Sequence, residues 1–268
     1  MKVGIVANTS KIKDSSIITK LAVQLEEYGY ACTLFRTYDQ ISGVEALIVL
    51  GGDGAILHSA VFAAQKNIPI IGINYGNLGF LAEYEREETS CVLELLDKLK
   101  NGTCHILERS LLQVTVGEKT YYALNEVCLQ RDCATQINSG GQILKANIEI
   151  GNEQNEVAGD GLLICTPTGS TAYSLSAGGA ILFPDIPVFM LTQLCSLSLH
   201  SRPVVFSDLE EVCVTVTRGV ALLSVDGRTV EVLRENERII IKKAPFNAKF
   251  PMNQKAVFLK KIKNKLNK

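Results

Sequence analysis

The sequence predicts an α/β unit built on a parallel sheet, followed by an antiparallel β unit. Apolar runs alternate with helical patterns up to about residue 102, and short segments of alternating polarity dominate after it. The length of 268 residues also suits nearly two domains of about 150 residues each. Hydrophobic residues make up 47% of the chain and charged residues 21%, which excludes a disordered chain, a coiled coil or a collagen-like repeat.

The first part, residues 1–102, carries continuous apolar runs separated by helix-length segments. Strands are expected at 3–7, 31–35, 46–50 and 68–73, and helices at 17–28, 55–65 and 91–100. A strand that is apolar on both faces must be covered on both faces. The alternation therefore predicts a parallel sheet with helices on each side.

The second part, residues 103–245, is predicted to be antiparallel. Its expected strands are 111–116, 121–129, 144–150, 162–166, 212–217, 222–225, 229–233 and 238–242. Turns such as Gly151-Asn152 and Asp226-Gly227 separate them. Residues 246–268 form a tail with a helical pattern at 256–266. That pattern has too little apolar surface to stand alone, so we expect the tail to pack back on the body.

Charge and cysteine usage limit the partners and the compartment. The formal net charge is −1, which argues against general nucleic-acid binding. Residues 251–268 hold six Lys and no acid, and without them the balance is 21 basic against 28 acidic residues, or −7. The longest apolar stretch is broken by Pro184, Asp185 and Pro187, so no membrane span is expected. The eight Cys form no C-x-x-C pair, which favours buried thiols in the cytoplasm over a zinc site.

A glycine-rich motif, Gly51-Gly52-Asp53-Gly54, stands where a predicted strand ends and a helix begins. Gly51, Gly52 and Gly54 would let backbone N–H groups approach phosphate oxygens, and the helix N-terminus adds partial positive charge. Asp53 could hold Mg²⁺ or accept a proton from an attacking hydroxyl. The alternative is a turn in which Asp53 caps the helix. His58 lies five residues later and is either a site residue or a packing histidine.

Two further segments carry polar groups. Asn125-Glu126 could recognise hydroxyl groups or base edges by donor and acceptor pairing, or could be an exposed turn. The run from Gly159 to Gly179 leads from a strand into a loop rich in Ser, Thr and Gly. Such a loop suits a ligand with ribose and amide groups, and Tyr173 could stack on a flat ring. The alternative is an ordinary Ser/Thr/Gly turn.

Together these segments resemble the motif set of the NAD kinase family. The resemblance rests on the glycine-rich motif, on Asn125-Glu126 and on the run from Asp160 to Gly179, and it also covers 72–81, 201–203 and 224–227. It implies a Rossmann-like N-terminal domain and an antiparallel β-sandwich-like domain that binds the dinucleotide. It further implies phosphoryl transfer from ATP, with a divalent metal (Mg²⁺), to the 2′-hydroxyl of the adenosine ribose of NAD.

The same resemblance assigns roles to single residues. Asp53 would be the general base, with Gly54 and His58 lining its site. Asn125 and Glu126 would bind the adenosine ribose, and Asp160 would face the nicotinamide end. The adenine and nicotinamide portions would contact four residues of the polar loop: Thr171, Ala172, Tyr173 and Ser176. No protein metal-ligand set is expected, and the family implies a homo-oligomer, a dimer or a tetramer.

This sequence departs from the family pattern at a few positions. Val188 replaces a small Ala associated with the dinucleotide, Arg228 stands where Gln is usual, and Leu197 falls where many members carry His.

The main alternative function is that of a lipid kinase of the diacylglycerol or sphingosine type, which shares Gly-Gly-Asp-Gly. A non-catalytic dinucleotide sensor is a further alternative. A dehydrogenase is disfavoured because no G-x-G-x-x-G follows the first strand.

Overall fold

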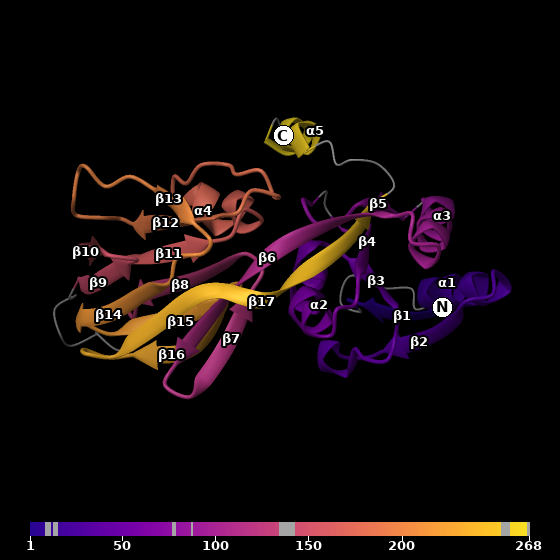
Figure 1. The fold of residues 1–268 in the computed structure, drawn as a ribbon, viewed down its shortest axis with the longest axis horizontal. Helices are drawn as coiled ribbons and strands as arrows, with labels where there is room; N and C mark the ends of the chain where they lie inside the picture. Colours follow the sequence, from indigo (N-terminus) through magenta and orange to yellow (C-terminus); the bar gives the residue numbers. More distant parts are fainter. Residues whose placement is uncertain are drawn as a thin grey trace. The chain divides into compact units, whose positions relative to one another are not determined.

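The computed structural model describes residues 1–8, 12, 16–76, 79–86, 88–133, 143–252 and 258–266. The chain divides into two compact units (Figure 1). The first unit comprises Met1–Arg109 with Phe246–Lys268, and the second comprises Ser110–Pro245. Residues 103–109 therefore fall in the first compact unit. No helix in the described part of the chain is long and apolar enough to cross a membrane.

The first unit is built on a parallel sheet with strand order β2-β1-β3-β4-β5. The strands are β1 (Lys2–Ala7), β2 (Ala31–Phe35), β3 (Ala46–Gly51), β4 (Ile70–Asn74) and β5 (Tyr84–Glu85). Its helices are α1 (Ser16–Glu27), α2 (Asp53–Gln65) and α3 (Thr89–Lys100), with a 3₁₀ turn η1 (Tyr38–Gln40). The predicted strands and helices of this part are confirmed, with shifts of a few residues at their ends.

The core of the first unit forms because its strands are apolar along their whole length. Every residue of β3 and of β4 is buried. On one side of the sheet, Leu21 and Leu25 of α1 and Leu95 of α3 pack against these strands. Burial on both faces explains the run of consecutive apolar residues in each strand.

The second unit holds two six-stranded antiparallel sheets, ordered β10-β9-β14-β17-β6-β7 and β13-β12-β11-β8-β15-β16. The strands are β6 (His105–Val116), β7 (Lys119–Ala123), β8 (Glu126–Arg131), β9 (Leu144–Ile150), β10 (Glu153–Gly159), β11 (Gly161–Cys165), β12 (Val188–Leu194), β13 (Val204–Ser207), β14 (Val212–Arg218), β15 (Ala221–Val225), β16 (Arg228–Leu233) and β17 (Arg238–Met252). A 3₁₀ turn η2 (Gly169–Thr171) and the short helix α4 (Tyr173–Ser176) follow β11. Strands β6 and β17 each have residues in both units.

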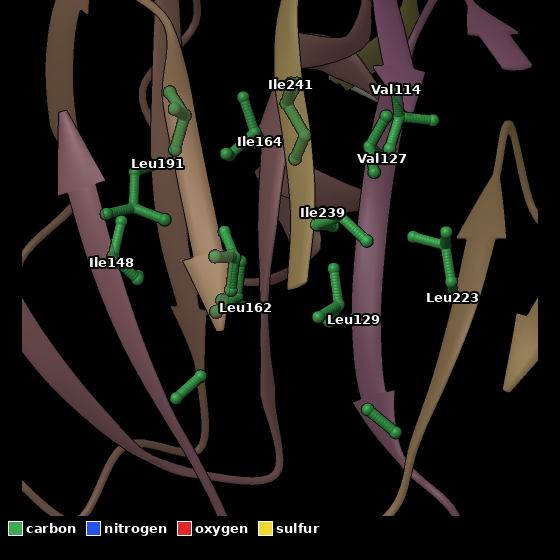
Figure 2. Packing of buried hydrophobic residues seen from close by; sticks show 14 of the residues in the cluster. Val114, Val127, Leu129, Ile148, Leu162, Ile164, Leu191, Leu223, Ile239 and Ile241 are labelled. Atoms are coloured by element: carbon green, nitrogen blue, oxygen red, sulfur yellow. The ribbon is translucent and has the colours of Figure 1, made fainter. Parts of the chain in front are cut away.

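The core of the second unit lies between its two sheets (Figure 2). Side chains such as Ile148 and Ile239 come from one sheet, and Leu129, Leu162 and Leu223 come from the other. Alternate residues of each strand face this layer, which is the usual consequence of strand pleating.

Several expectations for individual elements are wrong. The strand expected at 121–129 is split at Leu124-Asn125, and its halves, β7 and β8, belong to different sheets. The strand expected at 238–242 continues to Met252, so residues 246–252 are strand rather than tail. The sequence pattern did not predict strands β10, β12 and β13. Strand β10 is largely polar and exposed, and β12 follows a Pro-containing stretch, so neither shows clear alternation.

We expect Leu129→Ala to lower the free energy of unfolding by about 2–5 kcal/mol, because Leu129 is fully buried between the sheets. Urea denaturation of the two proteins measures this difference. The matched control is Leu199→Ala, since Leu199 is 87% exposed and should change stability by less than about 0.5 kcal/mol. Equal losses in both variants would contradict the packing described above.

Candidate functional site

The glycine-rich motif joins β3 to α2. Strand β3 ends at Gly51, Gly52 is the N-cap and α2 begins at Asp53. A Cβ on Gly51 would lie 2.7 Å from the Cβ of Ala55, so the strand and helix approach closely there. Gly54 is exposed, and a Cβ added to it would meet nothing within 4 Å. The motif thus places a helix N-terminus, with its partial positive charge, at the carboxyl edge of the sheet.

The N-cap of α2 is Gly52, so Asp53 is the first residue of the helix and the prediction that it stands at the N-cap is wrong. Its carboxylate instead accepts hydrogen bonds from two backbone N–H groups beyond β4. Phe80 donates to Oδ2 at 2.7 Å and Leu81 donates to Oδ1 at 3.0 Å. A Cβ on Gly79 would lie 1.8 Å from Oδ1, so only glycine allows this approach. The two bonds fix the orientation of the carboxylate.

A buried arginine lies within electrostatic reach of Asp53. Burial lowers the pKa of Arg109 to about 10, and the carboxylates of Glu83 and Asp53 act in the opposite direction. The guanidinium of Arg109 also lies over the ring of Phe250, 5.2 Å from its centroid. The Asp53 carboxylate therefore has a fixed positive charge in its neighbourhood.

His58 lies on the exposed side of α2, five residues after Asp53. Its ring is 5.8 Å from that of Tyr38, centroid to centroid, with a 31° angle between the planes. His58 is therefore a surface residue with an aromatic neighbour in η1.

In the second unit, Leu124 and Asn125 carry the chain from one sheet to the other, and Asp226 holds this crossing in place. The Asp226 carboxylate accepts three consecutive backbone N–H bonds, from Leu124 at 2.9 Å, Asn125 at 2.8 Å and Glu126 at 3.1 Å. Asp226 itself has a φ of 48°, in the left-handed region that suits the Asp-Gly turn between β15 and β16.

The polar loop after β11 packs on the same crossing. Thr166 donates its hydroxyl to the carbonyl oxygen of Leu124 at 2.5 Å and its N–H to that of Asn125 at 2.9 Å. A Cβ on Gly169 would lie 2.1 Å from the Asn125 oxygen, so glycine is required at this contact. The structure thus brings together two of the segments predicted to bind a ligand, Asn125-Glu126 and the polar loop.

The four predicted loop residues follow directly. Thr171 ends η2, and its hydroxyl donates to the carbonyl oxygen of Thr168 at 3.3 Å. Ala172 is the N-cap of α4, which runs from Tyr173 to Ser176. Tyr173 is 40% exposed, which leaves a ring face accessible to a ligand.

Glu126 is the most perturbed carboxyl group among these residues. It is 6% exposed, and within the described part of the chain its Oε2 has no hydrogen-bond partner. Burial, followed by the nearby charge of Asp226, raises the pKa of Glu126 to about 7. Burial also raises the pKa of Asp226 to about 6, against the lowering effect of its three backbone bonds and of Arg228. A ligand hydroxyl or amine could satisfy Glu126.

Asp160 and Glu126 lie toward opposite ends of the pairing between β8 and β11. Asp160 stands between β10 and β11, and its Oδ1 is 2.9 Å from Nε of Arg131. Burial raises the pKa of Tyr173, and smaller contributions come from neighbours that include Asp160 and Glu126. Tyr173 is therefore within electrostatic reach of both carboxylates.

Two residues that depart from the family pattern lie on different strands of one antiparallel sheet, with three strands between them. Val188 is half-buried at the start of β12 and packs on the cluster that contains Leu163 and Cys165. Arg228 is exposed at the start of β16, where its charge acts on Asp226. Arg228 therefore has an acidic neighbour within the chain.

Sequence reasoning missed the residues that hold the others. Asp226 stands in a predicted turn and within the range 224–227 of the resemblance, but the sequence assigns it no role, although an Asp before Gly can bond several backbone N–H groups. The segment from Gly79 to Leu81 lay within the resemblance but received no role. The burial of Arg109 could not be predicted from the sequence, because an Arg in an alternating strand is usually exposed.

Comparison with known proteins decides the family. The model of the ATP-NAD kinase N-terminal domain matches residues 33–104, and that of the ATP-NAD kinase C-terminal domain matches residues 124–252. The chain belongs to the ATP-NAD kinase family. An NAD kinase of Carboxydothermus hydrogenoformans is 35% identical over 232 residues, covering 83% of this chain and 79% of that protein. NAD kinase 2 of a Synechocystis species is 33% identical over 296 residues, covering 99% and 94%.

Solved structures show the same fold for this ATP-NAD kinase family member. Yeast NADH kinase complexed with NADH matches with a TM-score of 0.83 and 22% identity, over 100% of this chain and 87% of that one. An NAD kinase from Archaeoglobus fulgidus in complex with ATP matches with a TM-score of 0.78 and 21% identity, over 100% and 98%. The family assignment leaves the lipid-kinase alternative without support.

We expect the stability of this family member to fall with rising pH through the titration of Glu126. Its folded pKa of about 7 exceeds the ordinary 4.5, so the stabilisation is fully present below about pH 4.5 and is lost as the pH rises through about 7. Asp226 acts with the same sign between about pH 4 and 6. In Glu126→Gln the first contribution is absent, so the free energy of unfolding should decline less steeply. Urea denaturation at several pH values measures both slopes, and parallel slopes would rule out a titrating Glu126.

Proposed function

We propose that this chain is an NAD kinase, which transfers the γ-phosphoryl group of ATP to the 2′-hydroxyl of the adenosine ribose of NAD and yields NADP and ADP. The observation that carries the proposal is the Asp53 carboxylate, held by the N–H groups of Phe80 and Leu81 beside a helix N-terminus. The two named relatives are NAD kinases, and the match to this chain covers 79% and 94% of their lengths, which supports the choice of substrates.

Asp53 is proposed as the general base. The ribose oxygen forms a bond to the γ-phosphorus while the bond from that phosphorus to the bridging oxygen of ADP breaks. The hydroxyl proton passes to the Asp53 carboxylate. A carboxylate is a weak base towards an alcohol, so proton transfer is expected late, when the nucleophile has already lost electron density to phosphorus. The two backbone bonds keep the carboxylate oriented during this step.

The phosphates are proposed to lie on the glycine-rich motif, where Gly51, Gly52 and Gly54 offer backbone N–H groups at the start of α2. In the described part of the chain, no three or more His, Cys, Asp or Glu side chains are grouped so as to hold a metal ion. Mg²⁺ commonly binds through substrate phosphates and only one or two carboxylates. We propose that the phosphates of ATP would hold Mg²⁺, which when bound would neutralise part of their charge.

The second unit is proposed to bind the dinucleotide. Asn125 and Glu126 would pair with the ribose hydroxyls of the adenosine, and the ring of Tyr173 would stack on a base. Asp160 is proposed to face the nicotinamide end. The remaining proposed contacts are His58 and Gly54 on α2, and Thr171, Ala172, Ser176, Val188 and Arg228 in the second unit.

We further propose a cytoplasmic homo-oligomer, a dimer or a tetramer, that acts on small nucleotides rather than on nucleic acid. The near-neutral net charge supports small nucleotides over nucleic acid, and eight Cys without a C-x-x-C pair support the cytoplasm. The oligomer is proposed from the family resemblance.

Incubation of the purified protein with ATP, Mg²⁺ and NAD should yield NADP, identified by mass and by a coupled NADP-specific dehydrogenase. Parallel incubation with a diacylglycerol in place of NAD should yield no phosphorylated lipid. Failure to form NADP under any metal condition would overturn the proposal.

Asp53→Asn should lower kcat by at least about 10²-fold, in line with the loss of a general base. NAD should still bind, because the proposed dinucleotide contacts lie mainly in the second unit. Steady-state kinetics and calorimetric titration with NAD measure these two quantities, and the melting temperature controls for folding. Turnover close to that of the wild type would remove Asp53 from the proton-transfer step.

A further inference from the structure

The last described helix, α5 (Phe258–Leu266), contacts the segment that follows β4. The ring of Phe258 lies 6.5 Å from that of Phe80, centroid to centroid. The Lys261 ammonium donates to the carbonyl oxygen of Ala82 at 3.3 Å and to Glu83 Oε2 at 2.6 Å. Both side chains of this ion pair are about three-quarters buried, with exposures of 26% and 28%. Such a pair is less screened by water than one on an open surface.

The contacted segment is the one that holds the Asp53 carboxylate. Phe80, which touches Phe258, donates its N–H to Asp53, and Leu81 does the same one residue later. Ala82, whose carbonyl oxygen accepts from Lys261, follows directly. The residues that contact α5 are therefore either an N–H donor themselves, as Phe80 is, or next to one in the chain, as Ala82 is.

Leu81 and Glu83 of this segment also line a small hollow, together with Arg109, Phe250 and other residues. Glu83 lies between two cations, since it pairs with Lys261 and also acts on the buried Arg109. The Glu83 N–H is bonded to the carbonyl oxygen of Gly72 in β4 at 3.2 Å. The segment is thus anchored to the sheet at Glu83, while its preceding residues bond to Asp53 and contact α5.

We propose that α5 is a positioning element, which fixes residues 79–83 through Phe258 and Lys261 and so keeps the Phe80 and Leu81 N–H groups aimed at the Asp53 carboxylate. Phe258 and Lys261 are positioning residues and act only through this segment. The physical reason is entropic: ordering the residues of a connecting segment costs backbone freedom, and contacts outside the segment must offset that cost. The catalytic consequence rests on the function proposed above for Asp53.

Amide hydrogen exchange on the full chain tests the contact without reference to activity. In Lys261→Met and in Phe258→Ala, the amides of Phe80 and Leu81 should exchange about tenfold faster or more, because their bonds to Asp53 open more often. Lys261→Arg should retain most of the protection. The matched control is Lys263→Met, since Lys263 is an exposed residue of the same helix and should leave exchange unchanged. Amides of β3 provide an internal reference for overall stability.

The kinetic test uses the same variants in the NADP-forming assay. Lys261→Met and Phe258→Ala should lower kcat by about tenfold or more while the KM for NAD stays within about twofold, since misplacing a catalytic group slows the chemical step. A wild-type protein that forms no NADP defeats the proposed function, and the exchange data then decide the positioning role alone. Unchanged exchange at Phe80 and Leu81 overturns the inference, and so does faster exchange with an unaltered kcat in an active enzyme.

Discussion

The parallel pairing of β3 with β4 is the constraint on which the arrangement around Asp53 depends. Their register sets Gly51 beside Asn74, so both strands end at the same edge of the sheet. The glycine-rich motif leaves β3 there, and the segment that reaches Phe80 and Leu81 leaves β4 there. A residue 27 positions before Phe80 can therefore accept its N–H bond. If the register slipped by one residue, the side chains of a strand would change faces and this approach would be lost.

The second unit uses the same chemistry at a different place. The Asp226 carboxylate accepts hydrogen bonds from the N–H groups of three successive residues. The Thr166 hydroxyl and N–H donate to the carbonyl oxygens of Leu124 and Asn125 on the same crossing. In both units a side chain distant in sequence satisfies backbone groups that no regular ladder satisfies. In the second unit, the side chains that make these bonds, Asp226 and Thr166, are not themselves proposed to touch the dinucleotide. Their effect is to fix the backbone from which Asn125, Glu126 and Tyr173 project.

Electrostatics follow from the way charge is distributed along the chain. The body outside the last 18 residues carries a formal −7, and its proposed ligands are anionic. Neutralisation would therefore depend on local groups, such as the N-terminus of α2, the buried Arg109 and the metal proposed to accompany ATP. The lysine-rich tail has at least one defined role in the described part, because Lys261 pairs with Glu83. The tail thus differs from a freely solvated basic arm.

The fold class followed from the sequence because its pattern is local. Continuous apolar runs mark the buried strands of the first unit, and alternation marks most strands of the second. Where a strand was polar, as in β10, or where the chain changed sheets, as at Leu124-Asn125, the pattern gave no warning. The lesson is that periodicity reports the burial of side chains, whereas a change of sheet depends on which backbone groups find partners.

The sequence by itself determined the two-part fold, the position of Asp53 at the start of a helix and the family resemblance. Only the tertiary structure decided that Asp53 bonds to Phe80 and Leu81 rather than capping α2, and that Asp226 and Thr166 organise the crossing beside Glu126. It also decided the near-neutral pKa of Glu126, about 7, which arises from burial. The reason is physical: propensity and periodicity act between neighbours in sequence. Hydrogen bonds and burial depend on residues that only folding brings together.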